Sequence, residues 1–216
     1  MPIDWPSLHG EHFRGARVLV TGGAGFIGSH LVQALVQLGA DVVALDDLSG
    51  GDWANLDGFG EGVDQITDSI LNSDALSRAC AGCRYVFHEA ALGSVPASVE
   101  QPVAYHQVNV MGTIHVLQAA REAGVHRVVY AGSSSAYGNP PDGDTPKVES
   151  MCPSTLSPYA AAKLAAEHAM RAWAHCYDID TATVRYFNIF GPRQNANSAY
   201  AAVIAAFAKA LILDGE

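Results

Sequence analysis

A glycine-rich stretch, TGGAGFIG at residues 21–28, follows an apolar run and precedes a segment whose apolar residues have helical spacing. In a strand–loop–helix unit of this kind, Gly22 permits a tight turn, Gly25 lets the backbone approach a diphosphate, and Gly28 lets the helix pack close to the strand. The first turn of the helix then offers unpaired N–H groups to the phosphates. The spacing is GxxGxxG rather than GxGxxG. The stretch predicts a parallel α/β fold with a dinucleotide-binding loop.

The remainder of the chain continues this alternation. Strands joined by helices pair in parallel, and near-continuous apolar strands are typical of a sheet covered on both faces. We predict a Rossmann-type doubly wound parallel sheet with helices on both faces over residues 1–187, of which 1–14 form an N-terminal tail. Residues 188–216 are expected to begin a smaller substrate domain whose remainder is absent. The expected strands are 16–21, 41–46, 63–67, 84–88, 127–132 and 181–187, and the expected helices are 26–38, 72–81, 103–122, 158–177 and 199–213.

Composition excludes several function classes. The formal net charge is −10, which argues against general nucleic-acid binding, so a phosphate would be met by backbone N–H groups rather than by a basic surface. No apolar run is long enough to span a membrane, and the polar N-terminus lacks the features of a secretory signal, so we expect a cytoplasmic protein. A single CxxC, Cys80 to Cys83, does not complete a zinc site, and no metal is expected.

An acidic residue at the end of the second expected strand indicates which dinucleotide is bound. Asp46 lies 18 residues beyond Gly28, where a carboxylate accepts hydrogen bonds from the adenosine ribose hydroxyls. The same charge repels a 2′-phosphate, and the following residues 47–50 contain no Arg to offset it. NAD is therefore favoured over NADP.

Two further motifs could carry chemistry. Tyr159 and Lys163 stand at i and i+4 of an expected helix and share one face. An ammonium and a positively charged nicotinamide would lower the pKa of the phenol, which could then take a proton from a sugar hydroxyl as hydride leaves the same carbon. Ser133 and Ser134 end a strand, where ligands bind in such sheets. Taken alone, each motif also fits a solvated helix face or an ordinary serine-rich turn.

Together these motifs resemble the extended short-chain dehydrogenase/reductase family, specifically its nucleotide-sugar epimerases. The resemblance covers nearly the whole chain, and ALGSVPAS with the AYAAVI segment is most similar to the UDP-N-acetylglucosamine 4-epimerase branch, followed by UDP-glucose 4-epimerases. The matching segments are TGGAGFIG (21–28), LDDLSGG (45–51), HEAALGSVPAS (88–98), NVMGT (109–113), SSSAYG (133–138), YAAAK (159–163) and RYFNIFGPRQ (185–194).

The resemblance implies a role for individual residues. Ser133 and Ser134 would hold the reacting hydroxyl, Tyr159 would be the base, and Lys163 would modulate it and bind the nicotinamide ribose. The implied NAD-binding set, which also includes Tyr159 and Lys163, is Gly22, Gly25, Phe26, Ile27, Gly28, Asp46, Asp47, Leu48, Ser49, Gly50, Asp68, Ser69, Ala90, Ala91, Leu92, Asn109 and Phe187. The implied UDP-sugar contacts, besides Ser133, Ser134 and Tyr159, are Ser94, Asn188, Ala202 and Val203.

The reaction is narrowed by the motif after the fifth strand. Family members that dehydrate the sugar carry Asp-Glu there, whereas residues 133–136 read Ser-Ser-Ser-Ala. We therefore expect epimerisation at C4 through a transient 4-keto sugar with bound NAD. A non-catalytic dinucleotide sensor and a net dehydrogenase or reductase remain alternatives on the same fold. The resemblance also implies a homodimer in which helices 103–122 and 158–177 form a four-helix bundle, although their small-residue faces fit packing within one chain as well.

Overall fold

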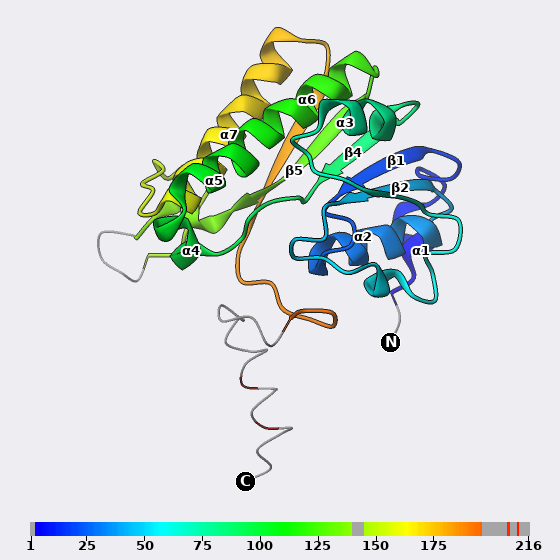
Figure 1. Ribbon diagram of the computed structural model, residues 1–216, viewed down its shortest axis with the longest axis horizontal. Helices are drawn as coiled ribbons and strands as arrows, with labels where there is room; N and C mark the ends of the chain where they lie inside the picture. The colour runs from blue at the N-terminus through cyan, green and yellow to red at the C-terminus, as the bar shows by residue number, and fades with distance from the viewer. Residues whose placement is uncertain (1–2, 140–144, 196–206, 208–210, 212–216) are drawn as a thin grey trace.

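In a computed structural model of this chain, the described residues are 3–139, 145–195, 207 and 211 (Figure 1). Six parallel strands form one sheet in the order β3-β2-β1-β4-β5-β6. The chain starts at the centre, moves outward to β3 and then crosses back to β4, which is the doubly wound topology expected from the sequence. The strands are β1 (Arg17–Thr21), β2 (Asp41–Asp46), β3 (Asp64–Thr67), β4 (Tyr85–His88), β5 (Arg127–Ser133) and β6 (Asp180–Tyr186).

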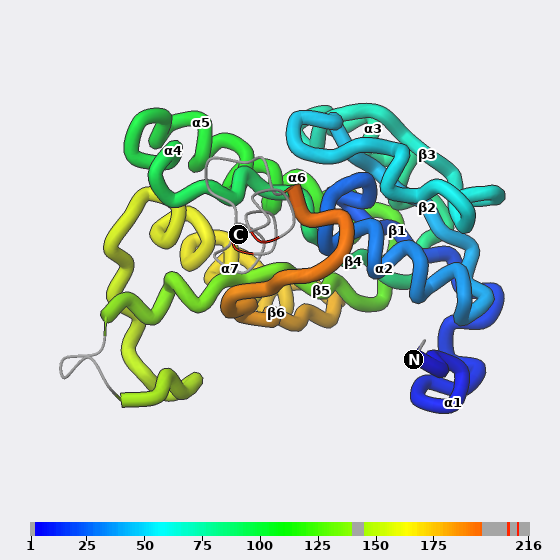
Figure 2. The backbone as a smooth tube through the Cα atoms, turned by 90° about the horizontal axis from the view of Figure 1, so that it is seen from below, coloured from blue at the N-terminus to red at the C-terminus, as the bar shows by residue number. Residues whose placement is uncertain are grey.

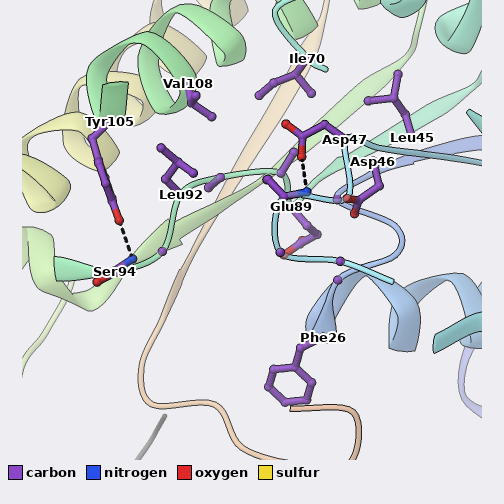
Figure 3. Close-up of a pocket in the computed structure, with 18 of the residues that line it drawn as sticks. Phe26, Leu45, Asp46, Asp47, Ile70, Glu89, Leu92, Ser94, Tyr105 and Val108 are labelled. Atoms are coloured by element: carbon purple, nitrogen blue, oxygen red, sulfur yellow. Dashed lines mark hydrogen bonds between the residues drawn. The ribbon is translucent and has the colours of Figure 1, made fainter. Parts of the chain in front are cut away.

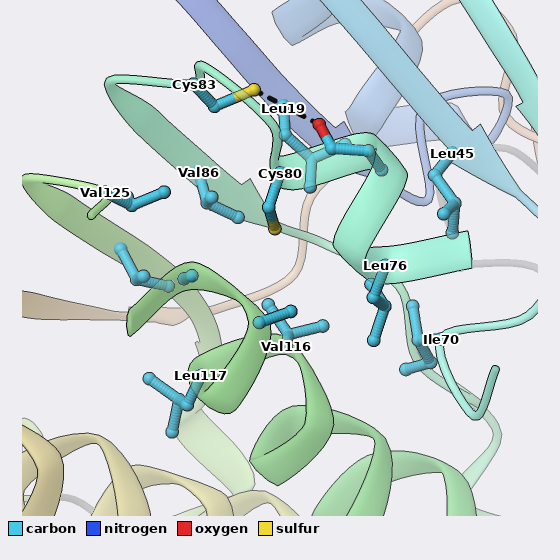
Figure 4. Close-up of a cluster of buried hydrophobic side chains, with 14 of the residues drawn as sticks. Leu19, Leu45, Ile70, Leu76, Cys80, Cys83, Val86, Val116, Leu117 and Val125 are labelled. Carbon is cyan, nitrogen blue, oxygen red and sulfur yellow. Dashed lines mark hydrogen bonds between the residues drawn. The ribbon is translucent and has the colours of Figure 1, made fainter. Parts of the chain in front are cut away.

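Helices cover both faces of this sheet because alternate strand residues are apolar on opposite sides. Leu19 of β1 points into a core formed with α3 (Ser73–Cys80), α6 (Thr113–Glu122) and α7 (Pro158–Cys176). Its neighbours Val18 and Val20 point into the opposite core, formed with α2 (Phe26–Gln37). Figure 4 shows the first core, where side chains of α3 and α6 meet those of β1 and β4. The fold class is confirmed.

The expected helix over residues 103–122 is divided into several segments. After an unexpected helix α4 (Val95–Glu100), the chain forms α5 (Pro102–His106), a π-helical segment η2 (Gln107–Gly112) and then α6. Gly112 faces Ile70, and a Cβ at this position would lie 2.5 Å from the Ile70 Cδ1 atom. The prediction of a long helix over residues 103–122 is confirmed, and the structure adds a π-helical segment within it.

The N-terminal residues contact the sheet instead of forming only a solvated tail. A short helix α1 (Trp5–His9) precedes Phe13, which packs against the α2-side core. The His12 ring nitrogen Nε2 lies 3.1 Å from the Tyr85 hydroxyl. Figure 2 shows α1 at one end of the molecule and the α4–α5 segment at the other. Two shorter 3₁₀ segments complete the described elements, η1 (Trp53–Leu56) and η3 (Ser134–Tyr137).

The expected last helix, 199–213, lies outside the described residues except for positions 207 and 211. The boundary expected near residue 187 stays a prediction. Within the described part of the chain, no helix combines the length and apolar character needed to cross a membrane.

Candidate active site

Two adjoining cavities lie at the carboxyl ends of the strands. The first, about 560 Å³, extends from Asp46 and Asp68 to Ser94, and the second, about 430 Å³, contains Tyr159 and Lys163. Figure 3 shows the first cavity, with Phe26 at the start of α2 on one side and Tyr105 and Leu92 on another. Both cavities are lined by Gly22, Phe26, Glu89, Ala91 and Gly93, so together they form one elongated trough.

The glycine loop has the close packing that its sequence predicts. Gly22 has a φ of +69°, and a Cβ there would lie 2.8 Å from the Ala90 backbone nitrogen. A Cβ at Gly28 would lie 2.0 Å from the Gly22 carbonyl oxygen. Helix α2 begins at Phe26 with no side chain capping its first N–H groups. Those groups and the dipole of the helix favour an anion at this point of the trough.

Asp46 has a structural role in addition to lining the trough. Its Oδ2 accepts a hydrogen bond of 3.0 Å from the Ala24 N–H, and its Oδ1 accepts one of 2.9 Å from the Leu48 N–H. The carboxylate thereby joins the glycine loop to the turn after β2. Burial raises the pKa of Asp46, and these two backbone donors oppose the increase.

Only some of the other residues expected near the adenosine line the first cavity. Asp47, Ser49, Gly50 and Asp68 line the first cavity, whereas Leu48 and Ser69 are not among its lining residues. The Ser69 hydroxyl instead accepts a hydrogen bond from the Leu71 N–H at 3.2 Å. Of these two residues, Asp68 alone lines the first cavity, and a contact of either Asp68 or Ser69 with the adenosine stays a prediction.

The segment after β4 forms the floor of the trough. Ala90, Ala91 and Leu92 line it, and the buried Asn109 side chain holds Leu92 from below. The Asn109 amide accepts from the Leu92 N–H at 2.8 Å and donates to the Leu92 carbonyl at 3.0 Å. Asn109 does not itself line either cavity. In this structure its side chain positions the floor of the trough, and a direct cofactor contact stays a prediction.

Five residues expected at the catalytic end line the second cavity: Ser133, Tyr159, Lys163, Phe187 and Asn188. Ile27 and Gly28 line it as well, and the predicted sugar contact Ser94 lines the first cavity. Ser134 is not among the lining residues; it begins η3, and its neighbour Ser133 caps that segment. The Ser133 hydroxyl lies 2.7 Å from the Ser135 hydroxyl. Ala202 and Val203 lie outside the described residues.

Lys163 is a buried amine with few partners. Its Nζ donates to the Ala131 carbonyl at 2.9 Å and lies 5.0 Å from the centre of the Tyr130 ring. Burial lowers the pKa of Lys163 to about 8, and the nearby Glu89 carboxylate opposes that decrease. The amine is therefore still mostly protonated at pH 7, as an electrostatic role beside Tyr159 requires.

The pKa of Tyr159 differs from the expectation. Burial raises it above the ordinary value, and a hydrogen bond with Ser133 opposes the increase. The expected decrease is wrong for the protein groups alone, because desolvation of the phenol outweighs their favourable interactions. A positively charged nicotinamide, on which the expectation also relied, would act in the opposite direction.

One residue of the trough was not recognised from the sequence. Glu89 follows β4 directly and lines both cavities. Its Oε1 accepts a hydrogen bond from the Tyr186 hydroxyl at 3.2 Å, and burial raises the pKa of its carboxyl to about 7. An acidic residue immediately after a buried apolar strand, in HEAA at 88–91, is the signal that could have identified it. The site thus contains a carboxylate even though residues 133–136 supply none.

The two buried thiols of the CxxC do not form part of this site. Burial raises the pKa of Cys80 to about 12 and that of Cys83 to about 11, so both remain thiols at neutral pH. Over the described ranges, no cluster of three or more His, Cys, Asp or Glu side chains has the arrangement of a metal site.

Comparison with known families agrees with this geometry. The model of the NAD dependent epimerase/dehydratase family matches residues 18–215. The chain belongs to this family. A UDP-glucose 4-epimerase of Mycolicibacterium smegmatis is 40% identical over 203 residues, which are 91% of this chain and 63% of the relative.

Solved structures of other family members superpose on most of the chain. A UDP-N-acetylglucosamine 4-epimerase from Methanobrevibacter ruminantium M1, in complex with UDP-N-acetylmuramic acid, has a TM-score of 0.88 at 40% identity and covers 94% of this chain and 64% of its own. A UDP-glucose 4-epimerase of Thermus thermophilus in complex with NAD has a TM-score of 0.82 at 37% identity. The match covers 91% of this chain and 62% of the Thermus chain. The chain therefore spans less than two thirds of the length of each of these relatives.

Proposed function

We propose that this chain is the cofactor-binding part of an NAD-dependent nucleotide-sugar 4-epimerase that acts on UDP-N-acetylglucosamine or UDP-glucose. The observation that carries the proposal is the trough itself. Ser133, Tyr159 and Lys163 line one end of it, and the glycine loop lines the middle. Relatives named as 4-epimerases of these two sugars match most of the chain.

The trough fits NAD. The uncapped N–H groups at the start of α2 would hold the diphosphate, and a Cβ at Gly22 or Gly28 would obstruct the loop. Asp46 and Asp47 at one end would accept from the adenosine ribose and would repel a 2′-phosphate. When bound, NAD supplies a reversible acceptor for hydride at the end of the trough where Tyr159 lies.

The protein groups at that end would move a proton. Tyr159 as phenolate takes the proton of the sugar 4-hydroxyl while the C4–H bond breaks and its hydride leaves, which gives a 4-keto sugar. After the ketone presents its other face, the hydride returns to C4 and Tyr159 returns the proton to the oxygen. Ser133 orients the hydroxyl, and we assign this role to Ser133 rather than Ser134 because only Ser133 lines the cavity. The Lys163 ammonium stabilises the phenolate.

Contacts with the rest of the nucleotide sugar complete this proposal. Ser94 and Asn188 line the trough where the sugar and its diphosphate would emerge, and Ala202 and Val203 are proposed to contact them further along the chain. The cytoplasm is the proposed location.

We also propose a homodimer through the helices that follow β4 and through α7. Three alanines of the small-residue face of α7, Ala160, Ala162 and Ala166, are buried within the chain. The support comes instead from exposed apolar residues on α4, α5 and η2, namely Val95, Val99, Val103 and Met111.

Glu89 gives a specific reason to test a second reaction. A carboxylic acid inside the cavity is the kind of group that sugar dehydration requires, so elimination of water is the competing chemistry. A dinucleotide sensor would bind NAD without turnover, and a net dehydrogenase would change the absorbance of added NAD stoichiometrically.

The test uses the 216-residue chain and a chimera in which residues 1–187 are joined to the corresponding C-terminal part of the M. smegmatis relative. Each is incubated with UDP-glucose and with UDP-N-acetylglucosamine without added NAD, and the sugars are separated. Formation of the C4 epimer by the chimera, and its loss on Tyr159→Phe, is the expected result. A 4-keto-6-deoxy product would indicate dehydration, and NAD binding without any product would favour the sensor.

A further inference from the structure

Glu89 is a half-buried acid to which the proposed reaction assigns no task. Its backbone N–H donates to the Thr21 carbonyl at 3.1 Å, which fixes the residue at the carboxyl edge between β1 and β4. Its Oε1 accepts from Tyr186, whereas Oε2 is shielded from solvent and has no hydrogen-bond partner among the described residues. A buried carboxylate oxygen without a partner is costly unless a ligand satisfies it.

The charged groups around Glu89 indicate which ligand its carboxylate would favour. Among the described residues that line the second cavity, Glu89 is the only acidic one and Lys163 is the only basic one. No ion pair within 4.0 Å joins them in the described part of the chain, so the amine does not occupy the free oxygen. Glu89 also lines the first cavity beside the glycine loop, which places it between the diphosphate position and Tyr159.

We propose that Glu89 sets the redox preference of this site by favouring the oxidised form of the nicotinamide cofactor over the reduced form. This inference rests on the proposed function, because it requires NAD to lie in the trough with its nicotinamide toward Tyr159. The oxidised ring carries a positive charge that the reduced ring lacks, so a nearby carboxylate attracts only the oxidised form. At separations of a few ångströms in partly buried surroundings, one such charge pair changes affinity by about tenfold or more.

Such a preference suits an epimerase. The enzyme of the proposed reaction keeps its cofactor and must hold it oxidised between turnovers, because a reduced cofactor without a keto sugar cannot begin a cycle. A carboxylate at this position stabilises the resting form. The Lys163 ammonium, which lines the same cavity, limits the effect, so that hydride transfer to the ring stays reversible.

The preference should depend on pH. The titratable groups that face Glu89 are Lys163 on α7, Tyr186 on β6 and Tyr130 on β5. Burial raises the pKa of Glu89 to about 7, with Lys163 and Tyr186 opposing the increase. The carboxylate is therefore mostly neutral at about pH 6 and mostly charged at about pH 8, and the preference for NAD⁺ should rise across this range, with partial loss of the Lys163 charge toward pH 8 acting in the same direction.

The experiment compares equilibrium binding of NAD⁺, NADH and ADP-ribose to nucleotide-free protein, using the wild-type chain, Glu89→Gln and Glu89→Asp. At about pH 8, Glu89→Gln is expected to weaken NAD⁺ relative to NADH by about tenfold and to leave ADP-ribose, which has no nicotinamide, unchanged. Glu89→Asp should retain most of the preference. Asp47→Asn is the matched control, because it removes the same charge at the adenosine end, where NAD⁺ and NADH are identical.

Each outcome bears on a different claim. Equal changes for NAD⁺ and NADH in Glu89→Gln, or a wild-type preference that does not vary across this pH range, would overturn the inference while leaving the cofactor site intact. Failure of the wild-type chain to bind ADP-ribose would instead contradict the proposed function. Retained ADP-ribose binding by Glu89→Gln shows that the variant is folded.

Discussion

At the scale of single residues, the proposed chemistry depends on a phenol that the protein alone makes less acidic. Burial raises the pKa of Tyr159, and Ser133 opposes the increase. Burial in the cavity thus favours the protonated phenol. In the proposed reaction, the oxidised nicotinamide would add a positive charge to that of Lys163 and favour the phenolate, which would couple proton transfer to the presence of the oxidised cofactor.

Tyr159→Phe tests this role directly. The substitution removes only the hydroxyl, so we expect NAD binding to change by less than about threefold and epimerisation by the chimera to fall by roughly 10²–10⁴-fold, the range typical of a lost general base. Binding is measured by calorimetry and turnover by separation of the two epimers. Phe190→Tyr, at an exposed position, is the control. Wild-type turnover in Tyr159→Phe would exclude the mechanism.

His88 is a second residue whose environment has a measurable consequence. Its ring is fully buried. The His88 Nδ1 lies 2.7 Å from the Thr21 hydroxyl, and the Nε2 lies 2.9 Å from the Thr113 hydroxyl. Burial lowers its pKa from 6.5 to about 3, with the Lys163 charge acting in the same direction. The unfolded chain therefore binds a proton below pH 6.5 that the folded chain does not bind until about pH 3.

We expect the free energy of unfolding to fall as pH decreases through this window, at about 1.4 kcal/mol per pH unit from this residue. His88→Gln should flatten that decrease even if it destabilises the protein at neutral pH. Urea unfolding at several pH values from roughly 7 to 4 measures the slope. The exposed His168→Gln should leave it unchanged. Protonation of Glu89 raises the free energy of unfolding as pH falls from about 7 to 4.5, which is opposite to the effect of His88. Each variant is therefore compared with wild type at the same pH.

At the scale of elements, the unit of function is the glycine loop with β1, α2 and the segment after β4. Gly28 lets α2 start directly against Gly22, and Gly22 lies against Ala90. Asp46 ties this loop to the turn after β2. The start of α2 is consequently held by three strands, which fixes its free N–H groups in a single direction.

Gly28→Ala should disrupt this unit. The new Cβ would lie 2.0 Å from the Gly22 carbonyl oxygen, and neither group can turn away because both are backbone or attached directly to it. We expect a loss of stability of about 1–3 kcal/mol or more and a loss of NAD binding of at least about tenfold. Gly50→Ala, whose Cβ meets nothing within 4 Å, should change stability by less than about 0.5 kcal/mol. An unfolding midpoint for Gly28→Ala equal to that of wild type would contradict the packing.

The elements differ in how far local sequence determines them. Strand β2 was predicted with its observed limits, because an apolar run that ends in Asp46 is a local signal. The π-helical segment at 107–112 within the expected helix was not predicted, since it accompanies hydrogen bonds between Asn109 and Leu92, 17 residues earlier. Glu89 was missed for a similar reason. Its acidity is visible in the sequence, but the Tyr186 hydroxyl that it accepts from is 97 residues away.

For the molecule as a whole, the two ends have different surfaces. One end carries α1, and the other carries α4 and α5 (Figures 1 and 2). Val99 is 65% exposed and Val103 is 81% exposed, and they follow each other on α4 and α5 with Val95 nearby. Exposed apolar side chains gathered on adjacent helices are typical of a protein interface.

This surface supports the proposed homodimer, and a charge placed on it should separate the subunits. We expect the wild-type chain to have the mass of a dimer at micromolar concentration and Val103→Glu to have that of a monomer, because an unpaired carboxylate buried in an apolar contact costs several kcal/mol. Light scattering coupled to size-exclusion chromatography measures the mass.

Leu8→Glu on α1, at the opposite end and 66% exposed, introduces the same charge and should leave the dimer intact. A monomeric wild-type chain, or a Val103→Glu variant that remains dimeric, would show that subunits do not meet at α4 and α5. NAD binding by a Val103→Glu monomer would further show that each subunit builds its cofactor site alone.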